Sequence, residues 1–273
     1  NLSLTNGELA VEIGNLLSKS VDAAVDAGSM IAGQITQVAD NISGVASDGI
    51  SNLTLTTAQD ADEIIALLGI NTSTDSVSVI ATGMSVAKLN AVAAEIDEVS
   101  SISGVVSVTS DLAAANLTTL AGQLTYAAGA DELSVNASGM SAAQLSAVAV
   151  VIAKVDDDGL SSLTLTDGNT VNADVITTLL GDKTAALSVS VVATGMSAAK
   201  LNKIALEIGE ITNAGIDGAL HLTSAISSGN LTALLTKNAS AAVVTIDATS
   251  MTADQLTAIG DSGTVLDGLS FTT

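Results

Sequence analysis

The chain has no cysteine, proline, arginine or tryptophan, and its 273 residues include one histidine, one tyrosine and one phenylalanine. Without cysteine it can form neither a disulfide nor a Cys/His dyad, although a secreted protein can also avoid thiols, so the redox compartment stays open. A triad or a metal centre needs converging partners, and the one histidine, His221, stands among hydroxyl and apolar residues. We therefore predict that the protein is not an enzyme and has no cofactor.

Basic residues are scarce, with seven lysines against 29 acidic residues and a formal charge of −22. This charge excludes electrostatic binding to nucleic acid or to an anionic membrane. The longest apolar run, Ala147–Ala153, is too short to span a bilayer, and no basic leader precedes an apolar segment. We expect no nucleic-acid partner and no membrane insertion.

One sequence unit, residues 133–154 (LSVNASGMSAAQLSAVAVVIAK), recurs along the chain. Its first residues alternate between apolar and polar, as in a strand with one buried face. Ser141 and Gln144 then form a capping-box signature that starts a helix, and apolar residues continue at helical spacing from Leu145 to Val155. The copies, which we call Met units, are marked by Met30, Met84, Met140, Met196 and Met251, about 55 residues apart.

Between the Met units lie Leu units, whose strands read LSLT (2–5), LTLT (53–56), VSVT (106–109), LTLT (163–166), LHLT (220–223) and LSFT (269–272). A fixed-period repeat indicates a solenoid, and β-α-β connections between parallel strands are nearly always right-handed. We predict an α/β fold, a right-handed α/β solenoid with about eleven parallel strands on one face, about ten helices on the other and about 27 residues per coil. A single solenoid domain over residues 1–273 would comprise double repeats at roughly 1–48, 49–103, 104–158, 159–215 and 216–273.

Turn chemistry marks the borders of these units. Asp-Gly pairs at 48–49, 158–159, 217–218 and 267–268 precede Leu-unit strands and are typical of turns. Lys88 and Lys200 replace the capping-box glutamine in two Met units, and we interpret them as solvated helix residues. Asn-x-Ser/Thr sequons such as those at Asn116 and Asn230 are expected by chance in a chain this rich in serine and threonine.

Aligning the strands gives columns of side chains. The central inward column is apolar throughout: Leu4, Val25, Leu55, Val79, Val108, Val135, Leu165, Val191, Leu222, Ile246 and Phe271. The outward columns are rich in hydroxyl residues, which suit the solvent side of a sheet. They would form one continuous polar face, with interaction candidates Thr54, Thr56, Thr164, Thr166 and Thr223. Ser, Asp, Ile and His interrupt the regularity that an ice-binding surface would need.

The acidic run Asp156, Asp157 and Asp158 is the candidate for calcium binding. Corresponding aspartates recur only in every second coil, about 10 Å apart, so a solvated turn is the favoured interpretation. His221 takes a position that holds serine or threonine in most other copies, and we interpret it as an ordinary exposed substitution.

The alternation of LTLT and SVxATGMSAAKLN-type sequences, without cysteine or proline, resembles the repeat regions of very large secreted bacterial cell-surface proteins, including those of cyanobacteria. The coil plan is similar to that of leucine-rich repeats, although the asparagine of that motif has no counterpart here. The resemblance covers the whole chain and implies export and an extracellular, cell-surface or filamentous role.

The first and last strands are apolar on the inside, whereas solenoids normally close with a polar capping unit. We therefore expect end-to-end stacking through Leu2, Leu4, Leu269 and Phe271, with the chain itself, as a homopolymer or as adjacent repeats of a longer chain, as its partner. The favoured function is a structural component of an extracellular bacterial filament or cell-surface layer. The alternative is an adhesin or binding module that holds glycan or ice on the hydroxyl face.

Overall fold

The computed structural model describes residues 2–70, 77–124, 133–169, 172–182, 190–207, 216–237 and 243–262, apart from the side chains of residues 156–158 and 182. The chain divides into two compact units, Asn1–Ser134 and Val135–Thr273. Both units are built from α-helices and short strands, and the strand pairs with a defined register are all parallel. The predicted mixed α/β class is confirmed.

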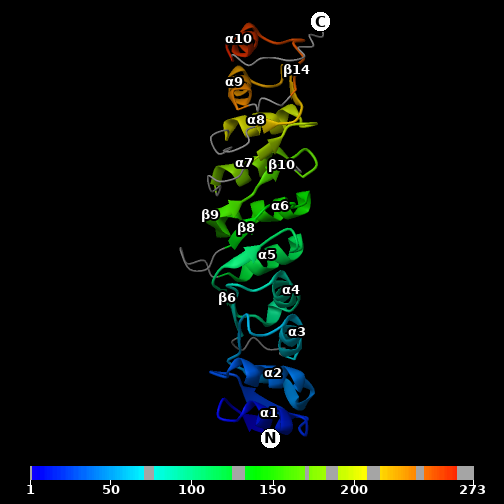
Figure 1. The fold of residues 1–273 in the computed structure, drawn as a ribbon, viewed down its shortest axis with the longest axis vertical. Coiled ribbons are helices and arrows are strands. Elements are labelled where there is room, and N and C mark those ends of the chain that lie inside the picture. The colour runs from blue at the N-terminus through cyan, green and yellow to red at the C-terminus, as the bar shows by residue number, and fades with distance from the viewer. Residues whose placement is uncertain are drawn as a thin grey trace. The chain divides into compact units, whose positions relative to one another are not determined.

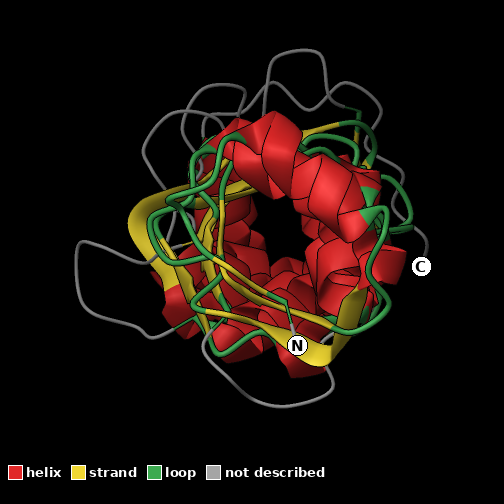
Figure 2. Ribbon diagram, turned by 90° about the horizontal axis from the view of Figure 1, so that it is seen from below, coloured by secondary structure: helices red, strands yellow, loops and turns green. Residues whose placement is uncertain are grey.

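The first unit alternates strands and helices in the following order: β1 (Ser3–Leu4), α1 (Ala10–Leu17), β2 (Ala23–Asp26), α2 (Ala32–Asp40), β3 (Val45–Ser51), β4 (Thr54–Leu55), α3 (Ala61–Gly69), β5 (Ser78–Ile80), α4 (Val86–Ala94), β6 (Ser101–Ser103), β7 (Val106–Val108) and α5 (Ala114–Gln123). Helices α1 to α5 pack in sequence order, each against the next (Figure 1). Strands and helices form separate layers (Figure 2).

The second unit repeats this order. Its elements are β8 (Leu133–Asn136, at the boundary), α6 (Ala142–Val150), β9 (Val155–Ser161), β10 (Thr164–Leu165), α7 (Ala173–Asp182), β11 (Ser190–Val192), α8 (Ala198–Leu206), β12 (Ile216–Asp217), β13 (Leu220–Leu222), α9 (Ser228–Thr236), β14 (Val244–Ile246) and α10 (Ala253–Asp261). Helices α6 to α10 again pack each against the next.

Ten of the eleven predicted strand centres fall in described strands, and the eleventh, at Phe271, lies outside the described residues. Neighbouring Leu-unit and Met-unit strands pair in the predicted register, for example Leu4 with Val25 and Leu55 with Val79. Every described member of the central inward column is at most 2% exposed. The period-two pattern therefore identified the buried face of each strand, because alternate side chains of a strand point to opposite faces.

Four described strands were not predicted, namely β3, β6, β9 and β12. Each lies third in its sheet, beside a Met-unit strand, so that Ile50 pairs with Val25 and Ile102 with Val79. The expected turn at Asp48 and Gly49 lies inside β3. These strands are very short or interrupted by polar residues and glycine, so they show no period-two pattern. The described strands form small sheets of two or three strands instead of the one continuous face that we expected.

The Met-unit helices are shorter than the apolar spacing predicts. Helix α6 ends at Val150 and is followed by a 3-10 turn, Ile152–Lys154, before β9 begins at Val155. The same turn follows α2 at Ile42–Gly44 and α4 at Ile96–Glu98. A 3-10 turn keeps residues three apart on one side, so it preserves the apolar spacing while it ends the helix.

A tight turn joins each Met-unit strand to its helix. The methionine N–H donates to the carbonyl of the alanine three residues earlier, at 2.9 to 3.2 Å in all five copies. The third turn residue has a left-handed backbone, with φ of 71° to 81° at Gly83, Gly139 and Gly195 but 63° at Ser29 and 64° at Ser250. This geometry is that of a type II turn, in which glycine is favoured at the third position.

We expect Gly83→Ala to lower the free energy of unfolding by about 1–2 kcal/mol, because alanine is strained at positive φ. An added Cβ would meet only the Thr57 methyl at 3.5 Å, so steric overlap does not contribute. Ser29→Gly relieves the same strain in another copy and should stabilise by up to about 1 kcal/mol. Urea unfolding followed by circular dichroism measures both. A neutral Gly83→Ala would contradict this turn assignment.

Candidate interaction surfaces

The first outward column, which lies one residue before the central inward column, places hydroxyl groups side by side on neighbouring strands. Thr54, Ser78 and Ser101 share one row across β4, β5 and β6, and the Ser101 hydroxyl lies 3.4 Å from that of Ser78. The Ser190 hydroxyl donates to Thr164 Oγ1 at 3.2 Å. Thr54 is exposed and Thr164 is half-buried. Several of these hydroxyls are therefore engaged with one another.

The second outward column, which lies one residue after the central inward column, has a different role, which the sequence did not reveal. The backbone N–H of Thr56 donates to Gln59 Oε1 at 3.0 Å, and its Oγ1 accepts from the Ala58 N–H at 3.2 Å. The Thr166 N–H donates to Asn169 Oδ1 at 2.7 Å, and Thr166 Oγ1 accepts from the Asn169 N–H at 3.1 Å. Thr223 Oγ1 likewise accepts from a backbone N–H two residues later. All three threonines are half-buried and fix the turn into the Leu-unit helix.

The third residue of the Met-unit helices contacts the preceding Leu-unit turn. The amide nitrogen of Gln34 donates to the carbonyls of Asn6 and Glu8, at 3.1 and 2.6 Å. Gln255 makes the corresponding bonds to Ser224 and Ile226. Both glutamines are buried, and their side-chain oxygens accept from the backbone N–H of the N-cap residue, Ile31 or Thr252, just before the helix. Each glutamine therefore ties two units together while it caps its helix.

Lysine makes the same contact between units in two other copies, so our interpretation of Lys88 and Lys200 as solvated residues was wrong. Lys88 Nζ donates to the carbonyl of Thr57. Lys200 Nζ contacts both the carbonyl and the carboxylate of Asp167, at 3.1 and 2.8 Å, and its side chain is only 14% exposed. The long lysine side chain reaches the neighbouring turn, a contact that a single repeat does not reveal.

Asparagine pairs join Met-unit helices to the Leu-unit helix that follows. Asn116 donates to Asn90 Oδ1 at 2.7 Å between α5 and α4, and Asn230 donates to Asn202 Oδ1 at 2.8 Å between α9 and α8. Asn116 and Asn230 are the sequon residues noted above, and both are half-buried. These two amides are committed to helix packing and are poor acceptors for a glycan.

Asp26 belongs to a turn cluster at the end of β2. Its Oδ1 accepts from Asn52 Nδ2 at 2.9 Å and from the Gly28 N–H at 3.1 Å. These two bonds, the Asn52 bond first, lower the pKa of the carboxyl below its usual value. Because the folded-state pKa is lowered, the associated stability is present above the usual carboxyl pKa and is lost as the pH falls through the lowered value.

No metal site is visible within the described part of the chain, where no three histidine, aspartate or glutamate side chains are placed to hold an ion. The structure does not describe the side chains of the calcium candidates Asp156, Asp157 and Asp158, so calcium binding at this acidic run stays a prediction. His221 is exposed, and its Nδ1 lies 2.9 Å from Thr245 Oγ1. None of the described helices has the length and hydropathy needed to cross a bilayer.

The four residues expected to make end-to-end contacts are not equally exposed, and two of them lie outside the described residues. Leu4 is only 1% exposed, inside its own unit, and Leu2 is half-buried. Leu269 and Phe271 lie outside the described residues. Apolar groups that do reach the surface near Leu2 in sequence include Leu9, the N-cap residue of α1, and Val11 and Leu16 within α1. The helix, which the strand pattern does not single out, therefore offers more apolar surface than the strand.

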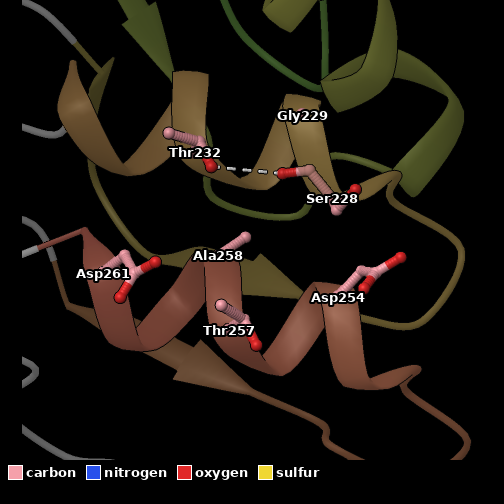
Figure 3. A pocket seen from close by; sticks show the side chains of 7 residues that line it. All are labelled: Ser228, Gly229, Thr232, Asp254, Thr257, Ala258 and Asp261. Atoms are coloured by element: carbon pink, nitrogen blue, oxygen red, sulfur yellow. Dashed lines mark hydrogen bonds between the residues drawn. The ribbon is translucent and has the colours of Figure 1, made fainter.

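A groove of about 440 Å³ runs between α9 and α10 (Figure 3). Small side chains such as Gly229, Thr232 and Ala258 line it, and Asp254 and Asp261 flank it on α10. The groove therefore presents carboxylate and hydroxyl groups among small residues.

A comparison with known protein families and with curated proteins finds no match to this chain.

Proposed function

We propose that the chain is a segment of a right-handed α/β solenoid, similar in plan to leucine-rich repeats, with the chain itself as its partner. Its function would be that of a structural component of an extracellular bacterial filament or cell-surface layer. The parallel β-α-β units and the sequential packing of α1 to α5 and of α6 to α10 support the solenoid. The charge of −22 and the resemblance to secreted surface proteins support the location.

One observation carries this proposal: the same helix interface is built four times. Helices α3, α5, α7 and α9 each have a leucine three residues after their first buried residue, and this leucine is 0% exposed in all four. The four residues are Leu67, Leu120, Leu179 and Leu234. Each of these helices packs against the Met-unit helix before it. A protein that buries its surface against copies of its own unit can be extended by adding further copies.

The alternative, glycan or ice binding on the hydroxyl face, has less support from the geometry. The Ser190 and Thr164 hydroxyls bond to each other, and Thr56, Thr166 and Thr223 hold turns. The described strands also form small separate sheets, whereas a flat regular array needs an extended face.

Electron microscopy of the purified chain, over a range of protein and salt concentrations, tests the proposal. We expect fibres or sheets whose mass grows with protein concentration. A chain that stays monomeric in light scattering under all these conditions would overturn the filament role.

A further inference from the structure

The residue that follows the third strand of each described three-stranded sheet has a left-handed backbone. These residues are Asn52 after β3, Gly104 after β6, Ser162 after β9 and Gly218 after β12, with φ of 55° to 77°. The last residues of the four strands are Ser51, Ser103, Ser161 and Asp217. The carbonyl of each accepts the N–H of the alanine that begins the Met-unit turn, at 2.8 or 2.9 Å. Within these four equivalent turns, the one after β12 therefore places a carboxyl group where the others have a serine hydroxyl.

The turn after β12 also requires glycine. Gly218 has φ of 77°, and a Cβ added to it would lie 2.5 Å from Thr194 Oγ1. Gly104 is restricted in the same way by Thr82. In both copies the threonine hydroxyl accepts from the N–H of the residue after the glycine, at 2.8 and 3.0 Å. The fold therefore keeps glycine directly after Asp217.

Asp217 holds its carboxyl group against the nitrogen of this glycine. The Gly218 N–H donates to Asp217 Oδ1 at 2.7 Å, and Asp217 is exposed. Oδ1 is bonded to Cγ, so the nitrogen lies beside the carbon that it would attack to close a succinimide ring. Glycine has no side chain to hinder this approach. Contact between two reacting groups before the reaction accelerates an intramolecular step.

We propose that Asp217–Gly218 is a site of spontaneous isoaspartate formation, with water as its co-reactant. The Gly218 nitrogen attacks Cγ of the protonated Asp217 carboxyl and loses its proton, and the carboxyl hydroxyl leaves as water, which closes the succinimide. Water then opens the ring. Cleavage of the N–Cγ bond restores aspartate, whereas cleavage of the bond to the α-carbonyl carbon leaves the main chain running through Cγ. One water is released and one is consumed, so the net reaction is an isomerisation at constant mass.

The Asp167–Gly168 pair provides an internal comparison. The Asp167 carboxylate accepts from Lys200 Nζ at 2.8 Å, so its carboxyl group is held by the lysine of the following Met-unit helix. The two Asp-Gly pairs are equivalent in a linear sequence, and only the structure distinguishes them. This inference does not depend on the proposed self-association.

Isomerisation would disturb the edge of the sheet. Asp217 pairs with Val192 of β11, and its carbonyl accepts from the Ala193 N–H at 2.8 Å. In isoaspartate this carbonyl becomes a free carboxylate and the main chain gains one carbon, so neither the pairing nor the turn through Gly218 can keep its geometry. Strand β12 has two residues, so few other bonds hold it. We expect the Ala193 and Ala219 amides to exchange faster in the isomerised chain.

Peptide mapping of the full chain after incubation for several weeks at physiological temperature tests the site. Trypsin cleavage after Lys203 and Lys237 isolates residues 204–237, and electron-transfer fragmentation distinguishes isoaspartate from aspartate. In the folded chain, isoaspartate should accumulate at Asp217 at least about fivefold faster than at Asp167. This difference should disappear in urea. A decrease in pH from about 8 to about 5 should accelerate the reaction, because the protonated carboxyl can lose water.

Asp217→Ser is the matched variant, because Ser103 occupies the same position in another copy. It should fold like the wild type by circular dichroism and form no isoaspartate in residues 204–237. Equal rates at Asp217 and Asp167 in the folded chain, or a rate at Asp217 that urea does not lower, would overturn the proposal. An isomer of residues 204–237 that persists in Asp217→Ser would also overturn it, since the reaction would then belong to another residue.

Discussion

Val25→Asp is expected to abolish the cooperative folding of the first unit or to lower its free energy of unfolding by at least about 4 kcal/mol. Val25 lies in the middle strand of the β1-β2-β3 sheet, pairs with Leu4 and Ile50, and is 1% exposed. A carboxylate at this position would be buried between the strands that carry Leu4 and Ile50. Burial of an unpaired charge is among the most costly single changes in a protein.

Ala24→Asp is the matched control for this change. Ala24 is the preceding residue of the same strand, but it is exposed, so the variant adds the same negative charge on the opposite face. We expect a change of less than about 1 kcal/mol. Urea unfolding followed by circular dichroism and by hydrogen exchange of β2 measures both variants. If the two variants were equally destabilised, the assignment of the inward and outward faces would be wrong.

Leu120→Ala is expected to cost about 2–5 kcal/mol of stability, the usual range for truncating a fully buried leucine. Leu120 is 0% exposed on α5, which packs against α4. Its counterpart Leu16 on α1 is 39% exposed, so Leu16→Ala should cost less than about half as much in the monomer. The pair thus measures how much stability the covering Met-unit helix provides.

The comparison requires conditions in which the chain is monomeric, such as low protein concentration. Urea midpoints measured under these conditions report both costs. Equal costs for Leu120→Ala and Leu16→Ala in the monomer would mean that the preceding helix contributes nothing at this position.

Local patterns determined most of the element positions. The alternation at residues such as Val79 and Val135 identified the strands and their buried faces, and Ser141 with Gln144 located a helix start that the structure confirms. Both signals depend on residues a few positions apart, so they can be recognised in a linear sequence. The solenoid, its function and its location remain proposals.

Only the tertiary structure decided what lies beside each element. The β3 pairing of Ile50 with Val25 and the Asn90–Asn116 contact join residues about one coil apart, and no local pattern encodes them. The sequence determined that each unit has an apolar side, since side-chain direction follows from the backbone period. Whether a given apolar side is covered depends on the neighbouring helix, which is why Leu16 and Leu120 are alike in the sequence but differ in exposure.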